Sequence, residues 1–194
     1  MSLAPATETA SASADVVRRT AFTLFGRFGY DGVSMTHLAR ECGLTKAGLY
    51  WHYESKQAHY ADCMRDMVGL FEAHVFAAAL REDQPAHQIL AAFEGLEDLL
   101  ADPRVAHGVA GFWLRPATAP VDEALAVQRD FEAMARGATA QILQAAVDDG
   151  ALALPLPADH HALVGLFAHM FFTSYARDSS LIDGLAKKLA AGHI

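Results

Sequence analysis

The stretch from Ser34 to Lys56, SMTHLARECGLTKAGLYWHYESK, constrains the fold of this chain more than any other feature. Ser34 is a favourable N-cap for one short helix, and Gly43 can end that helix because glycine tolerates a positive φ. Thr45 is a favourable N-cap for a second short helix, and Ser55 can cap a third that starts at Lys56. Two short helices joined by a turn that contains glycine predict a helix-turn-helix unit.

Hydrophobic periodicity predicts an all-α fold for the rest of the chain. Before the helix-turn-helix, apolar residues recur at helical spacing from about residue 15 to 28, at Val17, Ala21, Leu24, Phe25 and Phe28. A long helix is expected from residue 56 to about 80. Further helices are expected over residues 86–101, 105–114, 121–149, 159–176 and 180–190. No alternating pattern typical of a strand is found in the sequence.

These elements predict a division of the chain into three parts. Residues 1–13 are small and polar and are expected to form a disordered tail. Residues 14–57 should form a three-helix domain that contains the helix-turn-helix, and residues 58–194 a larger C-terminal helical domain. Hydrophobic residues make up 53% of the chain and its mean hydropathy is +0.15. This apolar character favours the burial of one surface against a second copy of the chain.

The charge of the chain is unevenly distributed. The net charge is −8, but residues 1–60 hold six basic and five acidic side chains, whereas residues 61–194 hold nine basic and eighteen acidic ones. Phosphate would be repelled by the second part. The asymmetry therefore favours a protein with one end that binds nucleic acid and another end with a different partner.

Several classes of protein are disfavoured by the motifs. No nucleophile elbow, glycine-rich phosphate loop or HExxH motif is present, so we expect neither an enzyme nor a cofactor. His160 and His161 lack further ligands at a suitable spacing, which predicts no metal site. The longest stretch without charged residues, 160–176, is short for a membrane span, and the N-terminus does not resemble a signal peptide. Cys42 and Cys63 are expected to be reduced thiols in a cytoplasmic protein.

The second short helix has features suited to contact with DNA. Thr45, Lys46 and Ala47 stand at its start, where exposed N–H groups attract phosphate and small side chains allow entry into a major groove. Lys46 can reach a phosphate or a guanine edge. Gly48 costs about 1 kcal/mol of helix propensity, which close approach to DNA would justify; clearance between helices is the alternative.

Other residues around this helix are candidate contacts with more than one interpretation. Tyr50 and His52 offer polar tips at phosphate distance or pack partly on neighbouring helices. Trp51 either contacts a thymine methyl group or fills the domain core. The remaining candidates are expected to meet the phosphate backbone: Thr36, Arg40 and Lys56. Because the helix contains no arginine, we expect DNA shape and phosphate contacts to contribute much of the recognition.

The motifs in this region resemble the DNA-binding domain of the TetR family of bacterial transcriptional regulators. The resemblance covers about residues 16–60 and rests on AFTLF at 21–25, GY at 29–30, SM at 34–35, LA at 38–39, GLTKAGLY at 43–50 and HYESK at 52–56. Two departures are visible. His37 stands where relatives often have an acidic residue, and Gln57–Tyr60 replaces the usual leucine, so that Tyr60 or Met64 must fill its core position.

The resemblance implies that residues 58–194 form an effector-binding and dimerisation domain. The expected partners are a second copy of the chain, a palindromic double-stranded DNA operator and a small apolar or aromatic effector. Candidates for the effector pocket are Phe71, His74, Phe93, Phe112, Trp113, Phe131, Met134 and Met170. A four-helix dimer interface is expected from Leu163, Leu166, Phe167, Phe171, Ile182, Leu185 and Leu189.

The predicted function is therefore that of a ligand-responsive dimeric regulator, a repressor, which leaves its operator when the effector binds. The alternative is an all-helical small-molecule-binding protein or enzyme with a vestigial helix-turn-helix. A DNA-binding protein that responds to no ligand is a third variant. The balanced charge of residues 1–60 and the intact stretch from Thr45 to Tyr50 favour the first hypothesis.

Overall fold

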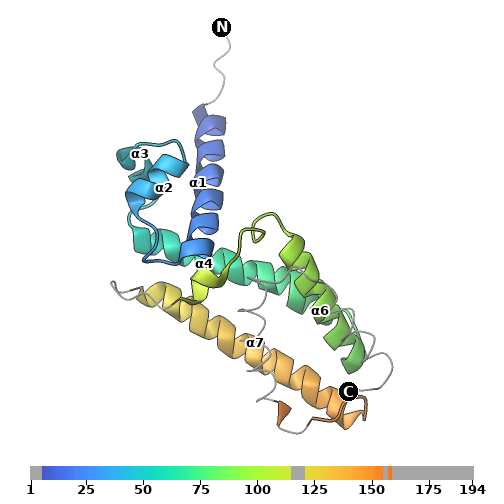
Figure 1. Cartoon of the computed structure of the whole chain (residues 1–194). Coiled ribbons are helices and arrows are strands. Elements are labelled where there is room, and N and C mark those ends of the chain that lie inside the picture. The colour runs from blue at the N-terminus through green and yellow to red at the C-terminus, as the bar shows by residue number, and fades with distance from the viewer. Residues whose placement is uncertain (1–5, 115–120, 155–156, 159–194) are drawn as a thin grey trace. The chain divides into compact units, whose positions relative to one another are not determined.

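The protein is all-helical over the residues that this computed structural model describes, 6–114, 121–154 and 157–158, which confirms the predicted fold class. Its elements, in chain order, are α1 (Ala6–Phe28), α2 (Met35–Glu41), α3 (Lys46–Tyr50), α4 (Lys56–Phe71), the π-helix η1 (Glu72–Phe76), α5 (Ala77–Ala79), α6 (Pro85–Ala101), the 3-10 helix η2 (Ala110–Trp113) and α7 (Asp122–Asp148) (Figure 1). They form two compact units. The first comprises residues 1–66 and 107–127, and the second comprises residues 67–106 and 128–194.

In the first unit, α2 and α3 lie together beside α1, and α4 begins near the C-terminal end of α1 (Figure 1). Each helix contributes the apolar face that its spacing predicted, and the buried residues include Val17, Ala21, Phe25, Leu38, Leu49, Tyr60 and Met64. Phe28 is an exception, because its ring is 43% exposed and the Arg27 guanidinium carbon lies 4.9 Å from its centroid. Tyr60 and Met64, the two residues expected to replace the leucine of the family, are both buried.

The start of α1 differs from the prediction. A disordered tail was expected over residues 1–13, but residues 6–13 belong to α1, and residues 1–5 lie outside the described part. The sequence ATETASASA at 6–14 is rich in alanine, which has the highest helix propensity. Extension of an existing helix costs little once the following turns are anchored in a core, since nucleation is the unfavourable step.

The first unit also contains a segment from much later in the chain. Phe112, in η2, is 1% exposed and its ring centroid lies 5.1 Å from that of Phe22 in α1. Gly111 packs so closely on the C-terminal turn of α1 that a Cβ atom would lie 2.6 Å from the Gly26 carbonyl oxygen. The first unit therefore extends beyond the predicted 14–57 domain, because its core includes a side chain that local patterns could not assign to it.

In the second unit, the helical run that begins with α4 continues through η1 and α5 as far as Ala79. A single regular helix to about residue 80 was expected; the π turn at Glu72–Phe76 corrects this. Gly95 of α6 lies directly against that turn, and a Cβ atom there would come within 2.8 Å of the carbonyl carbon of His74. A further cluster joins α6 to α7 through Ile89, Ala146 and Leu152.

Glycines with a positive φ follow the ends of α2 and α7, as predicted for Gly43. Gly43 has φ +67° after α2, and Gly150 has φ +74° after α7. Both are conformations that other residues adopt only with strain.

Among the helices of the described ranges, none combines the length and apolar character needed to cross a membrane. The two helices predicted beyond residue 158 lie outside the described residues.

Candidate nucleic-acid interface

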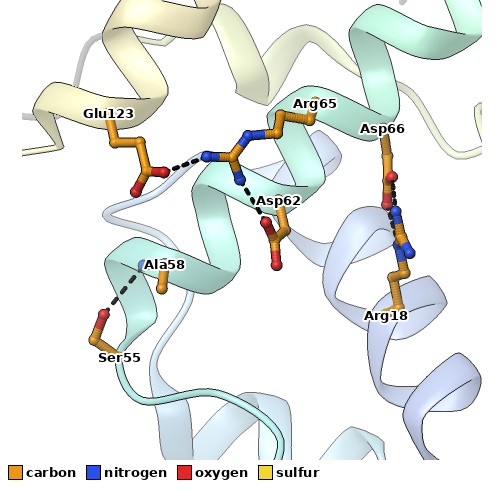
Figure 2. A network of polar contacts seen from close by, with 7 residues as sticks. All are labelled: Arg18, Ser55, Ala58, Asp62, Arg65, Asp66 and Glu123. Carbon is orange, nitrogen blue, oxygen red and sulfur yellow. Dashed lines mark hydrogen bonds and ion pairs between the residues drawn. The ribbon is translucent and has the colours of Figure 1, made fainter.

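The helix-turn-helix is positioned by three side-chain caps. The Ser34 hydroxyl accepts a hydrogen bond from the His37 N–H at 3.0 Å, and the Thr45 hydroxyl accepts one from the Gly48 N–H at 3.0 Å. The Ser55 hydroxyl accepts one from the Ala58 N–H at 3.1 Å (Figure 2). All three predicted N-caps are confirmed. Each cap satisfies an N–H group that has no partner within its own helix, and so fixes where the helix begins.

The outer surface of α3 is open to solvent. Leu49 is buried and anchors the helix, whereas Lys46, Ala47 and Tyr50 are exposed. Trp51, which follows the helix, is 92% exposed. Of its two interpretations, the core residue is therefore excluded, and a large apolar side chain stands in solvent at the end of α3.

The structure also distinguishes the two interpretations of Gly48. A Cβ atom at this position would meet the Thr45 hydroxyl at 3.3 Å and the Leu44 Cβ at 3.9 Å, and both atoms belong to the turn that precedes α3. No other helix of the described chain lies within 4 Å of that position. Clearance between helices therefore does not explain the glycine.

The candidates on either side of α3 differ in exposure. Thr36 and Arg40 on α2 are exposed, and the Arg40 Nη2 lies 3.0 Å from the carboxylate of the adjacent Glu41. His52 and Lys56 are half-buried. The Lys56 Nζ lies 3.9 Å from the ring centroid of Tyr30, and the desolvation that accompanies this position lowers the pKa of the lysine. Lys56 is thus a fixed cation at the first turn of α4.

Ion pairs connect the elements that support this surface (Figure 2). Arg18 of α1 binds both carboxylate oxygens of Asp66 on α4, with its Nε 2.6 Å from Oδ2. Arg65 of α4 pairs with Asp62 one turn earlier and with Glu123 of α7. These contacts hold α1, α4 and the start of α7 together within the first unit.

His59 is a buried titratable residue that sequence reasoning did not single out. Its side chain is 0% exposed, it stacks on Tyr53 with centroids 3.5 Å apart, and neither ring nitrogen has a hydrogen-bond partner in the described chain. The pKa of His59 is lowered to about 4, chiefly by burial and in part by His52, whereas Asp66 acts in the opposite direction. The one available signal was its spacing, because residues 59, 63 and 67 recur on the buried face of α4.

The predicted effector residues of the described chain are divided between the two units, with Phe112 and Trp113 in the first and the others in the second. Phe112 belongs to the core of the first unit, since its ring packs on Phe22 and Tyr60, and this contradicts its assignment to a pocket. Trp113 follows it in η2 and is half-buried. Met134 is 38% exposed on α7. Local helical spacing could not reveal these environments because they depend on contacts between distant segments.

The remaining candidates lie in the second unit. Phe71 packs on Phe131 with ring centroids 5.3 Å apart, and Phe93 packs on the cluster that contains Ile89. The His74 Nε2 lies 3.7 Å from the Asp102 carboxylate, and a hydrogen bond from Arg104 lowers the pKa of Asp102 to about 2. Met170 and the seven predicted interface residues lie outside the described residues. Within the described ranges, no three His, Cys, Asp or Glu side chains are grouped so as to hold a metal ion.

The fold and this surface define an all-helical protein whose first unit contains a capped helix-turn-helix. Residues 17–60 match the family described as bacterial regulatory proteins, tetR family. This part of the chain therefore matches the TetR family, as the sequence motifs indicated.

Curated relatives share this region. The biofilm operon icaADBC HTH-type negative transcriptional regulator IcaR of Staphylococcus aureus (strain Newman) is 35% identical over 51 residues, which cover 26% of this chain and 27% of the relative. The regulator of the same description from Staphylococcus epidermidis is 32% identical over 57 residues, which cover 29% and 31%. The matched part thus spans less than a third of the length of these relatives.

Solved structures resemble nearly the whole chain. AibR, in a complex with isovaleryl coenzyme A and operator DNA, has a TM-score of 0.76 at 21% identity over 90% of this chain and 96% of its own. A TetR-family transcriptional regulator from Agrobacterium tumefaciens has a TM-score of 0.71 at 18% identity over 93% and 97%. At these identities the likeness shows a shared fold.

Proposed function

We propose that this protein is a dimeric transcriptional regulator, a repressor, that binds a palindromic DNA operator and leaves it when a small effector binds. The observation that carries the proposal is the open face of α3, which presents Lys46, Ala47, Tyr50 and Trp51 in a TetR-family DNA-binding domain. A short capped helix with one apolar anchor and an exposed far side is suited to a major groove.

The chemistry of the exposed residues suggests how the groove is read. Lys46 donates to a phosphate or a guanine edge, and the Trp51 ring offers an apolar surface to a thymine methyl group. The small residues Ala47 and Gly48 permit close approach of the helix to the bases. The further phosphate contacts that we propose come from Thr36, Arg40, Thr45, Tyr50, His52 and Lys56. Since α3 has no arginine, DNA shape contributes a large part of the specificity.

IcaR gives a precedent for repression and AibR one for effector binding, whereas release on effector binding is our own proposal. IcaR is named a negative transcriptional regulator, and AibR was crystallised with both an acyl coenzyme A and operator DNA. For this chain we propose an apolar or aromatic effector, bound among Phe71, His74, Phe93, Phe131, Met134 and Met170, and a dimer formed through the helices predicted beyond residue 158. Release requires that the effector bind one of two conformations more tightly than the other. We place the protein in the cytoplasm and propose no enzymatic activity.

Selection of DNA from a random pool tests this function directly. The full-length protein should enrich duplexes with two inverted half-sites, and light scattering should find two or more chains on each duplex. The alternative of a vestigial helix-turn-helix predicts no enrichment over the starting pool. A monomer alone on single half-sites would contradict the dimeric arrangement.

Substitution of Lys46 by alanine should weaken binding to the selected duplex at least about tenfold, because one charged contact with DNA is lost from each subunit of the dimer. The slope of log affinity against log salt should fall by about 1.8, the contribution of two neutralised phosphates. Fluorescence anisotropy at several salt concentrations measures both quantities. Arg81→Ala removes an exposed cation from the second unit and is the matched control, with no expected change. Equal losses in the two variants would contradict the assignment of Lys46.

A further inference from the structure

A lysine held over a tyrosine ring stands at the beginning of α4, beside the proposed DNA-binding surface. The Lys56 Nζ lies 3.9 Å from the ring centroid of Tyr30, within the range of a cation–π interaction. Tyr30 is 4% exposed, and Lys56 is half-buried. A lysine side chain that is free in solvent loses rotamer entropy when it binds. The contact with Tyr30 therefore orders the ammonium group before DNA arrives.

The ring of Tyr30 is itself fixed by a second tyrosine. Its centroid lies 5.2 Å from that of Tyr60, with the planes at 72°, an edge-to-face contact of favourable geometry. The Tyr60 hydroxyl donates a hydrogen bond to the Phe112 carbonyl oxygen at 3.3 Å, and the Phe112 ring packs on Phe22. All of these residues belong to the first unit. The position of the Lys56 ammonium thus depends on side chains from α1, α4 and η2 and from the turn after α1.

We propose that Tyr30 is a positioning residue for DNA binding, which holds the Lys56 ammonium in place for a phosphate while Tyr60 and Phe112 hold the tyrosine ring. The inference rests on the proposed function, because it requires a phosphate at Lys56. The ring covers one side of the ammonium, whose three N–H donors can still reach a phosphate oxygen. Desolvation lowers the pKa of Lys56, and Asp31, next to Tyr30 in sequence, opposes this shift by favouring the charged form.

A double-mutant cycle on Tyr30 and Lys56 tests the proposal with the selected duplex. Tyr30→Leu removes the ring face and should weaken binding about tenfold, because the freed lysine side chain must then lose its rotamer entropy when it binds the phosphate. Tyr30→Phe keeps the face and should bind within about twofold of the wild type. In the Lys56→Gln background, Tyr30→Leu should cause no further loss, because no ammonium remains to be positioned.

Two results of the cycle would overturn the proposal. An equal loss for Tyr30→Leu with and without Lys56 would show that Tyr30 acts only on the stability of the domain. Binding by Tyr30→Leu as tight as that of the wild type would show that the ring does not assist the lysine. Failure of the wild-type protein to bind any duplex would instead overturn the proposed function, and the DNA-binding role of Tyr30 with it.

A nuclear magnetic resonance measurement tests the contact even if Tyr30→Leu does not fold. The chain has four lysines, at positions 46, 56, 187 and 188, so the ε-methylene signals of selectively labelled full-length protein are few. The Lys56 signal, identified by its loss in Lys56→Gln, should be shifted upfield by the ring current of Tyr30. Tyr30→Phe should retain this shift. An unshifted Lys56 signal in the wild type would overturn the proposal, whatever the DNA-binding results.

Discussion

Gly111 in the first unit and Gly95 in the second both allow two backbones to meet, but they serve different kinds of core. Gly111 lies against the last turn of α1 and brings the Phe112 ring among other aromatic rings. Gly95 lies against the π turn of η1, and the nearby cluster of α6 and α7 is built from Ile89, Ala146 and Leu152. The first unit is therefore closed by one distant aromatic side chain, and the second by the close approach of helix backbones.

Substitutions at Gly111 and Gly95 are expected to have the largest effects on stability. Either Gly111→Ala or Gly95→Ala introduces a Cβ atom that overlaps backbone atoms, so each should lower the free energy of unfolding by about 3 kcal/mol. Gly111→Ala should also weaken DNA binding strongly, because it displaces the segment that completes the DNA-binding unit. Gly95→Ala should affect DNA binding much less. Urea denaturation and anisotropy with the selected duplex measure the two quantities.

Gly69→Ala is the matched control for both substitutions. Gly69 lies in α4 and is exposed, and a Cβ atom at this position would have no atom of the described chain within 4 Å beyond its own helix backbone and chain neighbours. Alanine should therefore stabilise the helix by about 0.5–1 kcal/mol. Equal losses of DNA binding in Gly111→Ala and Gly95→Ala would contradict the distinction between the two units.

Much of the first unit could be predicted because its signals are local. The caps Ser34, Thr45 and Ser55 act on N–H groups three residues away, and Gly43 ends α2 through its own φ. Phe112 could not be assigned in the same way, since its partners lie more than 50 residues earlier. Its apolar spacing is equally compatible with a pocket, which is how we interpreted it. Burial among distant segments is a tertiary property that periodicity does not encode.

Local sequence patterns also failed to predict part of the second unit. The π turn at Glu72–Phe76 has no sequence signature in an otherwise regular helical pattern, so one continuous helix was predicted. The contact of Gly95 with the backbone of this turn involves two segments that are about 20 residues apart. Single-sequence reasoning can place both segments in helices, but it cannot pair them.

A second prediction concerns His59, which gives the first unit a sensitivity to acid. Its pKa of about 4 in the folded protein lies below the ordinary value of 6.5, so the folded state disfavours the protonated ring. With respect to His59, the free energy of unfolding is therefore highest above pH 6.5. It decreases as the pH falls towards 4, because the unfolded chain takes up a proton more readily than the folded one. The loss should reach about 3 kcal/mol at the lower end. Urea denaturation at a series of pH values measures it.

His59→Phe is the variant that isolates this effect. Phenylalanine retains a ring that can stack on Tyr53 but cannot take up a proton, so the free energy of unfolding should depend less on pH between 6.5 and 4. His87→Phe is the control for the replacement of a histidine by phenylalanine, because the His87 side chain is 59% exposed and lies in the second unit. If His59→Phe and the wild type show the same pH dependence, buried His59 is not the source of acid sensitivity.

The smallest predicted effect concerns the ion pair between Arg18 and Asp66, which joins α1 to α4. The Arg18 side chain is 56% exposed, and exposed pairs contribute at most about 1 kcal/mol because solvent and salt screen them. A double-mutant cycle with Arg18→Gln and Asp66→Asn should give a coupling energy below this value, and the coupling should decrease at high salt. The pair does join two helices and is bidentate, the geometry that favours a measurable contribution. A coupling well above 1 kcal/mol that persists in high salt would show that charge, and not the aromatic core around Phe112, determines how α1 is held on α4.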